Sequence, residues 1–158
     1  MAKVKDTGCC KRFDPKPWDK KTIKWTSKLF VKGRVGCLFY MPVGLGGFMK
    51  RVMKEIDESK ALAKTDIMLM NFTSMWGADI YVHVAKPVKG LTTTKLSGTF
   101  MSKVYEGPYN QTGKWVQDME KYVKSKKKKM KKIYYFYTTC PKCAKEYGKN
   151  YTVLLAQI

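Results

Sequence analysis

The sequence predicts an α+β fold of two tandem strand–helix–strand–strand modules with a ligand cleft between them. Hydrophobic residues make up 44% of the 158-residue chain and aromatic residues 13%, which is enough for a packed interior. A shift of 66 residues brings Pro42 onto Pro108 and Met53 onto Met119, as an internal duplication would. Each half then shows the same order of short apolar runs around one amphipathic segment.

The predicted organisation has an N-terminal arm and two modules. Residues 1–30 contain the proline-rich stretch DPKPWDKK, which predicts a mostly irregular arm, and its scattered apolar side chains suggest that it packs on the body. The body covers residues 31–158, with module one at 31–90 and module two at 91–158. One such module would leave a sheet face uncovered, so two are expected to pair along a groove.

The elements of module one follow from short patterns. Residues 34–42 (RVGCLFYMP) are apolar and bounded by glycine and proline, which predicts a strand. Residues 44–59 (GLGGFMKRVMKEIDES) carry apolar side chains at helical spacing, so we expect an amphipathic helix. Two further strands are predicted at residues 66–74 (DIMLMNFTS) and 78–87 (ADIYVHVAKP).

Module two repeats this order. The segment GTFMSKVYEGPY (98–109) predicts a strand that ends in a Gly-Pro turn, and NQTGKWVQDMEKYVKS (110–125) predicts a helix. The closing strands are expected at 132–139 (KIYYFYTT) and 150–158 (NYTVLLAQI). The lysine-rich segment 124–132 predicts a solvated connecting loop, with an anionic docking patch as the alternative.

The charge bears on the class of partner. The formal net charge is +20, from 32 Lys and Arg against 12 Asp and Glu. Such a charge attracts anions, nucleic acids and acidic lipid surfaces. Only Arg12, Arg34 and Arg51 are arginines, and arginine makes most of the bidentate contacts to bases and phosphates. Nucleic acid is therefore not expected as the main partner, and a lysine-driven polyanion or nucleic-acid binder is kept as an alternative.

The N-terminal segment and the cysteines predict the compartment. No apolar run follows MAKVKDTGCCKRFD, so no secretory signal is predicted. No stretch approaches the roughly 18 apolar residues of a membrane span. Five cysteines, an odd number, indicate a reducing cytoplasm with free thiols. We expect a cytoplasmic protein, monomeric or dimeric, with no membrane partner.

The motif CPKC places Cys140 and Cys143 in a loop between two predicted strands. A structural zinc site needs four ligands, and the remaining candidates are Cys9 and Cys10, adjacent in sequence, and His83. A redox pair would favour a helix N-terminus, where the thiolate is stabilised. The favoured interpretation is a loop without metal, and zinc binding and a reactive thiol remain open.

The segment KVYEGPYNQTGKW, a strand ending in Tyr-x-Gly-Pro-Tyr followed by a helix with a tryptophan, resembles the second module of the GyrI-like small-molecule-binding domain family. The resemblance extends over roughly residues 30–158 through the repeated element order. More narrowly, CCKRFDPKPWDKK, VYEGPY and YYFYTTCPKCAKEYGKNY resemble a bacterial branch that includes the cyclopropanoid cyclopropyl hydrolases. These enzymes open the reactive cyclopropane of DNA-alkylating natural products.

The resemblance implies a groove for flat aromatic or cationic ligands in which a carboxylate recognises the guest. Glu106 is the best candidate, because alternation along TFMSKVYE places it on the face of Phe100, Ser102 and Val104. A carboxylate in apolar surroundings becomes a usable acid or base near neutral pH. The alternative is a solvated Glu106, or one paired with a lysine. Late-strand acidic residues of the drug-binding relatives are missing here, so Glu146 of the long loop is a second candidate.

The aromatic residues on elements around the predicted groove complete the expected site. The catalytic candidates are Glu106 and Tyr109, and the ligand-binding candidates are Tyr40, Trp76, Tyr105, Trp115, Tyr134, Phe136 and Glu146. Each aromatic side chain of this kind is more often part of a core than a ligand contact, so only some of them are expected to line the groove. His83, the only histidine, shares a strand face with Asp79 and Tyr81, and no catalytic triad follows from the spacing.

We therefore expect binding of hydrophobic aromatic small molecules, with hydrolysis of a reactive, cyclopropane-bearing ligand as a hypothesis. In that reaction Glu106 would activate a water and Tyr40 or Tyr109 would hold the ligand's oxygen. No metal or organic cofactor is expected. The alternatives are a ligand sensor or sequestering module without turnover, and the polyanion binder described above.

Overall fold

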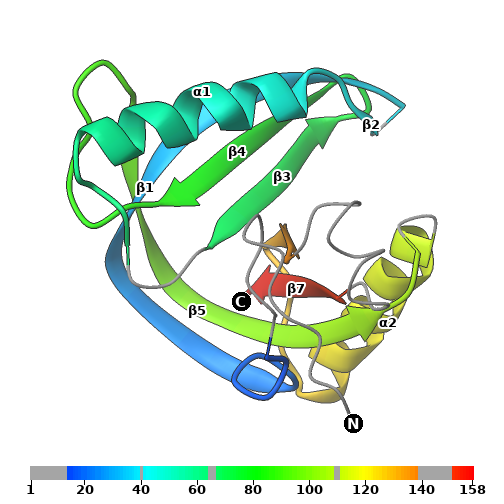
Figure 1. Cartoon of the computed structure of the whole chain (residues 1–158). Coiled ribbons are helices and arrows are strands. Elements are labelled where there is room, and N and C mark those ends of the chain that lie inside the picture. Colours follow the sequence, from blue (N-terminus) through cyan, green and yellow to red (C-terminus); the bar gives the residue numbers. More distant parts are fainter. Residues whose placement is uncertain (1–13, 40, 64–66, 109–110, 139–150) are drawn as a thin grey trace, which may run out of the picture. The chain divides into compact units, whose positions relative to one another are not determined.

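The computed structural model describes residues 14–39, 41–63, 67–108, 111–138 and 151–158. Along the chain the elements are β1 (Lys21–Leu38), β2 (Met41–Pro42), α1 (Leu45–Glu58), β3 (Met68–Ser74), β4 (Gly77–His83), β5 (Thr93–Glu106), α2 (Thr112–Ser125), β6 (Lys132–Tyr137) and β7 (Tyr151–Gln157). Figure 1 shows them coloured along the sequence. By compactness the chain divides into two units, unit 1 with Met1–Lys24 and Thr99–Ile158, and unit 2 with Trp25–Gly98.

Unit 2 contains α1 and the antiparallel strands that precede and follow it. In register, β1 pairs with β4 from Phe30 opposite His83 to Gly36 opposite Gly77, and β4 pairs with β3. The short β2 pairs with the end of β1. Alternation along these strands puts Val31, Gly33 and Val35 on one face, and this face packs against α1 through Val52 and Ile56, both 1% exposed.

A glycine makes the contact between α1 and β1 possible. A Cβ added at Gly33 would lie 2.2 Å from the Cζ atom of Phe48, so the phenylalanine ring occupies the space where any other side chain would begin. Gly36, on the same strand, has no heavy atom within 4 Å of such a Cβ. The helix can therefore approach the strand closely at one point, at Gly33.

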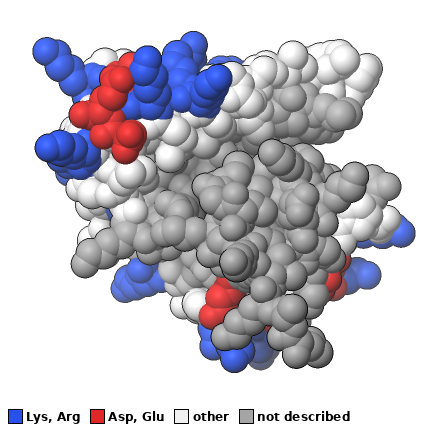
Figure 2. Space-filling model, in the orientation of Figure 1, with Lys and Arg blue, Asp and Glu red and all other residues white. Residues whose placement is uncertain are grey.

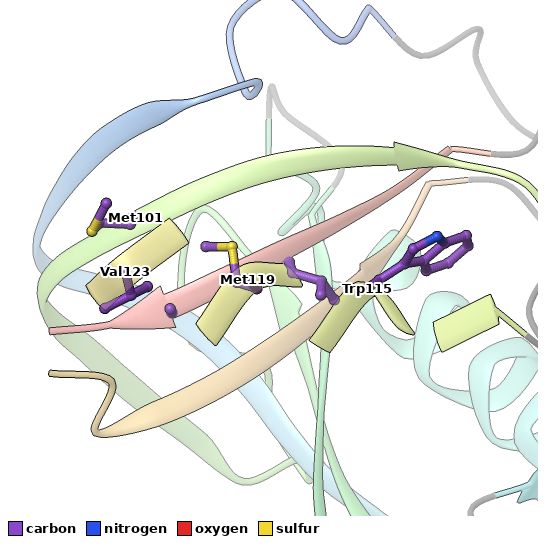
Figure 3. Close-up of a cluster of buried hydrophobic side chains, with 6 residues drawn as sticks. Met101, Trp115, Met119 and Val123 are labelled. Atoms are coloured by element: carbon purple, nitrogen blue, oxygen red, sulfur yellow. The ribbon is translucent and has the colours of Figure 1, made fainter. Parts of the chain in front are cut away.

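Unit 1 contains α2 on a sheet of β5, β7 and β6. The strand β7 lies between the other two and pairs antiparallel with both, from Phe100 opposite Gln157 on one side and from Lys132 opposite Gln157 on the other. A core cluster joins α2 to this sheet and consists of Met101, Trp115, Met119, Val123, Leu154 and Ala156. Figure 3 shows Trp115, Met119 and Val123 along one side of the helix.

The strand pairing corrects the predicted fold class. The seven strands belong to one sheet with the order β2-β1-β4-β3-β6-β7-β5, and β1 also pairs with β5. The described residues are thus mainly β, with two helices, and the predicted α+β arrangement of two tandem strand–helix–strand–strand modules with a ligand cleft between them is wrong. Local patterns identify each element, but which edges pair depends on contacts between distant residues.

The strands β1 and β5 differ most from the sequence prediction. β1 begins at Lys21, so the last ten residues of the expected irregular arm belong to a strand of 18 residues. β5 begins at Thr93 and has 14 residues. Both strands run through both compact units, and at the border Ser27 has φ 49° and donates its backbone N–H to Ser97 Oγ at 2.8 Å. A positive φ inside a strand is a local irregularity that sequence alternation does not signal.

Candidate functional site

Each unit has one sheet face that its helix covers and one that it does not, which we call the helix-free face of that unit. In unit 1, register places three alternate residues of β5, Phe100, Ser102 and Val104, on the helix-free face, together with Glu106 at the strand's end. Tyr134 and Phe136 of β6 lie on the same face, opposite Leu155 and Val153 of β7.

Aromatic rings dominate the helix-free face of unit 1. The ring of Trp18 meets the ring of Phe136 edge-on, with centroids 5.3 Å apart, and the rings of Phe100 and Tyr134 lie 6.0 Å apart. The buried hydroxyl of Ser102 donates a hydrogen bond of 2.5 Å to the carbonyl oxygen of Trp18. These contacts fix the segment before β1 against β5 within the unit.

Burial changes along this face toward the end of β5. Phe100 is 1% and Ser102 0% exposed, Val104 is half-buried, and Glu106 is exposed. Near this end the backbone N–H of Val104 donates to Asp19 Oδ1 at 3.2 Å, so a second carboxylate lies beside the strand. Among the described residues, the face therefore passes from a closed aromatic interior to an open, acidic end.

Two predicted ligand-binding residues lie on the opposite face of the same sheet. Tyr105 stacks on Trp115, with centroids 5.7 Å apart and an interplanar angle of 22°, beneath α2. The Tyr105 hydroxyl donates to Asp118 Oδ2 at 2.7 Å, and Lys103 Nζ lies 2.5 Å from the same oxygen. Alternation along β5 separates Tyr105 from Glu106, because consecutive side chains of a strand point to opposite faces.

The pKa values of Tyr105 and Asp118 are both shifted from their usual values. Burial, followed by the hydrogen bond to the Asp118 carboxylate and its charge, raises the pKa of Tyr105 well above its usual value. The pKa of Asp118 is lowered by the hydrogen bonds from Lys103 and Tyr105. The phenol thus stays protonated and acts as a donor that fastens α2 to β5.

The helix-free face of unit 2 carries both an ion pair and aromatic rings. Register puts Asp79 opposite Arg34 of β1 on one side and opposite Asn71 of β3 on the other. Arg34 Nη1 lies 3.4 Å from Asp79 Oδ1, and the Asp79 side chain is only 15% exposed. Gly77 permits this position of the arginine, because a Cβ there would meet Arg34 Nη2 at 2.5 Å.

His83 lies on this same face, beside an aromatic cluster. The ring of Phe30 is 5.4 Å from the ring of His83 and 6.3 Å from the ring of Tyr81. The Nδ1–H group of His83 donates a hydrogen bond of 2.9 Å to the carbonyl oxygen of Leu29. Burial lowers the pKa of His83, and the Leu29 carbonyl partly offsets this. The histidine is therefore a half-buried, hydrogen-bonded residue.

The remaining predicted site residues are at the surface or outside the described residues. Trp76 is 56% exposed in the turn after β3, and its ring lies 5.1 Å from that of Phe39, which is 66% exposed. Tyr40, Tyr109 and Glu146 lie outside the described residues, as do Cys140 and Cys143. Within the part of the chain that the structure describes, no three His, Cys, Asp or Glu side chains come together as a metal site.

Sequence reasoning missed the partners of these groups. The sequence predicts that the arm with Trp18 and Asp19 packs on the body, but it does not indicate that their partners are Phe136 and β5. Arg34 and Asn71 were not singled out, although the alternation that put Asp79 and Tyr81 on one face was visible in ADIYVH. Their partners became evident only with the register, because they belong to neighbouring strands.

None of the described helices is both long and apolar enough to span a membrane.

Trp115 and Tyr134 are 8% and 2% exposed, and Phe136 is 5% exposed, so these three predicted ligand-binding residues are part of the packed interior of unit 1. Glu106 alone among the described candidates combines a position on a helix-free face with an exposed carboxylate.

Several solved structures are similar to this chain over most of their length. A hydrolase encoded by lin2189 from Listeria innocua matches with a TM-score of 0.63 and 10% identity, covering 89% of this chain and 92% of that one. A second hydrolase from Listeria innocua has a TM-score of 0.60 and 11% identity, covering 88% and 92%. SAV2435, solved bound to tetraphenylphosphonium, has a TM-score of 0.51 and 12% identity, covering 87% and 92%.

At such low identity these structures show a shared fold. No curated protein matches the chain. The family described as bacterial hydrolase matches residues 1–158, the whole of the sequence. The chain therefore belongs to the bacterial hydrolase family.

Proposed function

We propose that this protein is a GyrI-like domain that binds hydrophobic aromatic small molecules and hydrolyses reactive, cyclopropane-bearing compounds among them, as a detoxification. Membership of a hydrolase family supports a hydrolytic activity. The similar structure bound to tetraphenylphosphonium, a cation with four aromatic rings, supports the class of ligand. The observation that carries the proposal is the helix-free face of unit 1, where aromatic side chains lead to the exposed Glu106.

The proposed reaction begins with the flat ligand against aromatic rings at the open end of this face, where Trp18 is half-buried. Aromatic contacts of this kind favour offset or edge-on packing and hold a ring in a defined orientation. Holding the strained ring beside a positioned water removes much of the entropic cost of the reaction. Water displaced by the ligand would also leave the Glu106 carboxylate in a less polar environment.

In the chemical step, Glu106 accepts a proton from water as the water oxygen forms a bond to the electrophilic cyclopropane carbon. The carbon–carbon bond of the ring breaks, and its electron pair moves into a conjugated carbonyl oxygen. Tyr109, or Tyr40 as a second candidate, donates a hydrogen bond to that oxygen as it becomes negative. The proton held by Glu106 is then released, and the ligand oxygen takes up a proton from solvent, so that the product is the ligand plus one water; no metal or organic cofactor takes part.

The test is incubation of the full chain with a cyclopropane-bearing alkylator, with the hydrated product measured by mass spectrometry. Glu106→Gln should abolish turnover and leave ligand binding within a few-fold, because the amide keeps the shape but cannot accept the proton. Glu120→Gln, an exposed carboxylate on α2, is the matched control and should turn over like wild type. Full activity of Glu106→Gln would show that the assigned base is wrong.

A second variant distinguishes the two helix-free faces. Asp79→Asn removes the half-buried carboxylate of unit 2 beside Arg34. If the reaction uses Glu106, the Asp79 variant keeps its turnover once its fold is confirmed by circular dichroism. If Asp79→Asn abolishes turnover and Glu106→Gln does not, the reacting face is that of unit 2.

A sequestering role without turnover is the second candidate function. It is favoured by the similar structure solved with a bound organic cation, since that ligand has no bond of the kind hydrolysed here. A titration of tryptophan fluorescence against planar aromatic compounds measures binding independently of chemistry. Saturable binding together with unchanged alkylator after prolonged incubation would assign this role and exclude the hydrolase.

A further inference from the structure

Unit 1 contains a cavity of about 450 Å³ at the C-terminal end of α2. Its lining comes from four separate segments of the unit, namely the start of β1, the middle of β5, the end of α2 with the residues that follow it, and the residue after β7. The lining residues are Lys20, Thr22, Thr99, Met101, Tyr122, Lys126, Lys128 and Ile158. This volume is within the range of sites for small molecules, about 300–1,000 Å³.

The cavity has an apolar floor. Met101 is 3% exposed and belongs to the core cluster beneath α2, and Tyr122 and Ile158 are half-buried against that cluster. Figure 3 shows Met101 of β5 near Val123, which belongs to the last turn of α2. The cavity is therefore on the helix-covered side of the sheet, whereas Glu106 lies on the helix-free face of the same unit. The two sites are separate, and the inference does not depend on the proposed function.

The rim of the cavity is positively charged. Lys20, Lys126 and Lys128 are exposed at its edge, and no Asp or Glu side chain is part of the lining. Hydroxyl groups of Thr22 and Thr99 add uncharged donors, as does that of Tyr122. Three like charges around one concavity repel one another, and an anion among them removes this repulsion.

Two other lysine positions on the described surface have acidic side chains close by. Along α1, Lys54 is followed within one turn by Asp57 and Glu58, and Figure 2 shows blue and red side chains intermingled over the C-terminal part of that helix. Lys103 pairs with Asp118. At the cavity the lysines have only hydroxyl and apolar neighbours in the lining, so their charges are available to a ligand.

Stabilisation of the helix end explains only part of this cluster. Cations near a helix C-terminus interact favourably with the helix dipole, and Lys126 follows α2 directly, with its Nζ 6.0 Å from the ring centroid of Tyr122. Lys20 comes from more than one hundred positions earlier in the chain and Lys128 lies beyond the helix end. Lys127, between the two cavity lysines, has φ 57°, a left-handed conformation that reverses the chain there.

We propose that this cavity binds a small organic phosphate. Lysine ammonium groups act as point charges toward phosphate oxygens, and the hydroxyls supply the remaining hydrogen bonds. The apolar part of the ligand would lie on Met101, Ile158 and the ring of Tyr122. Two lysines of the lysine-rich segment 124–132, Lys126 and Lys128, thus have a specific role in addition to the general positive charge of the segment.

The experiment compares two double variants of the same segment. Lys126→Gln with Lys128→Gln removes two cavity lysines, and Lys127→Gln with Lys129→Gln removes two exposed neighbours that are not part of the lining. Both variants lose the same net charge, so a general attraction weakens equally in both. The probes are adenosine monophosphate and inorganic pyrophosphate, titrated by calorimetry into the full chain at roughly physiological ionic strength.

We expect saturable, one-to-one binding by wild type and a Kd about tenfold or more weaker for the variant at positions 126 and 128, since each lost charge-assisted contact is worth a sizeable factor. The variant at 127 and 129 should bind within about twofold of wild type. Equal weakening of both variants would overturn the site in favour of a diffuse lysine field. Absence of saturable binding of either probe to wild type would also overturn it.

A milder variant guards against loss of structure. Tyr122→Phe keeps the ring that packs on the core cluster and removes only the hydroxyl. It should bind adenosine monophosphate several-fold more weakly while its thermal unfolding stays like that of wild type. If this variant and the variant at 126 and 128 both bind like wild type, the cavity is not the binding site.

Discussion

The two units attach their helices to their sheets by different means. In unit 2, α1 reaches β1 through an apolar contact in which Phe48 occupies the space above Gly33. In unit 1, α2 is held by a stacked pair, Tyr105 and Trp115, and by the Asp118 carboxylate. The helix-free faces differ as well: both carry aromatic rings, but in unit 2 they lie on the same face as the Arg34–Asp79 pair.

This difference shows that a repeated element order need not repeat the chemistry. Both units place a helix on one face of an antiparallel sheet, so the same apolar spacing occurs in both helices. The opposite faces carry few constraints from helix packing, and their side chains differ: unit 2 combines the polar group around Asp79 with the rings of Phe30 and Tyr81, and unit 1 has an aromatic set around Phe136. Three pairs of substitutions test this difference, the first across the two units and the other two within one unit each.

The largest effect is expected from the helix cores. Met119→Ala in α2 removes a side chain with 0% exposure, and Ile56→Ala in α1 removes one with 1% exposure. Each should lower the free energy of unfolding by about 2–5 kcal/mol, because the lost burial leaves a cavity. Urea unfolding followed by circular dichroism and by tryptophan fluorescence measures both values.

The same pair tests whether the units unfold together. Since β1 and β5 each belong to both units, we expect a single transition that both substitutions shift. Two transitions, of which each substitution moves only one, would show that the units are energetically separate. Met53→Ala, at a position 36% exposed on α1, is the control and should change stability by less than about 0.5 kcal/mol.

A smaller effect is expected at the close contact of unit 2. Gly33→Ala would put a methyl group 2.2 Å from the Phe48 ring, so the ring has to move away from the strand. Overpacking of this kind costs typically about 1–3 kcal/mol, and movement of a side chain places the cost at the lower end. Gly36→Ala, with open space around the new methyl, should be neutral or slightly stabilising in the same unfolding measurement.

The smallest effect concerns the polar attachment of unit 1. Asp118→Asn removes the charge that Lys103 and Tyr105 share, and because the Asp118 side chain is 49% exposed the loss should be less than about 1 kcal/mol near neutral pH. Glu120→Gln, exposed two residues later, is the control and should be neutral. Comparison of the two by thermal unfolding isolates the Asp118 contacts.

The pH dependence of this difference has a definite sign. The folded-state pKa of Asp118 is below its unfolded value of 3.8, so the carboxylate contributes stability above that pH. As pH falls below this value and through the folded pKa, the contribution disappears and wild type approaches Asp118→Asn. A stability difference that stays constant from neutral pH down into this acid range would contradict the assigned contacts.

The sequence predicted local structure well where one pattern was sufficient. The amphipathic spacing of Phe48, Val52 and Ile56 predicted the helix that is now α1, and the spacing of Trp115, Met119 and Val123 predicted α2. These predictions are confirmed because a helix buries one face whatever it packs against. The starts of β1 and β5 were missed, since Trp18 and the following polar residues carry no clear alternation.

For the candidate site, the sequence predicted the strand face of single residues but not which residues lie together. Alternation correctly put Glu106 on the face of Phe100 and Ser102, because that relation stays within one strand. It could not separate Tyr105 and Trp115 from the other aromatic candidates, because their place beneath α2 depends on how the helix crosses the sheet. Whether Glu106 is the base, and whether Tyr134 and Phe136 contact a ligand, stays a prediction.

The sequence by itself determined the element types, the excess of positive charge and the side-chain faces within each strand, because these depend on neighbouring residues and on composition. Only the tertiary structure decided the order in which the strands pair, that Asp79 meets Arg34, and that Lys20 reaches the same cavity as Lys126. These features join residues far apart in the chain, and the register and chain path that bring them together are set by the packing of the whole molecule.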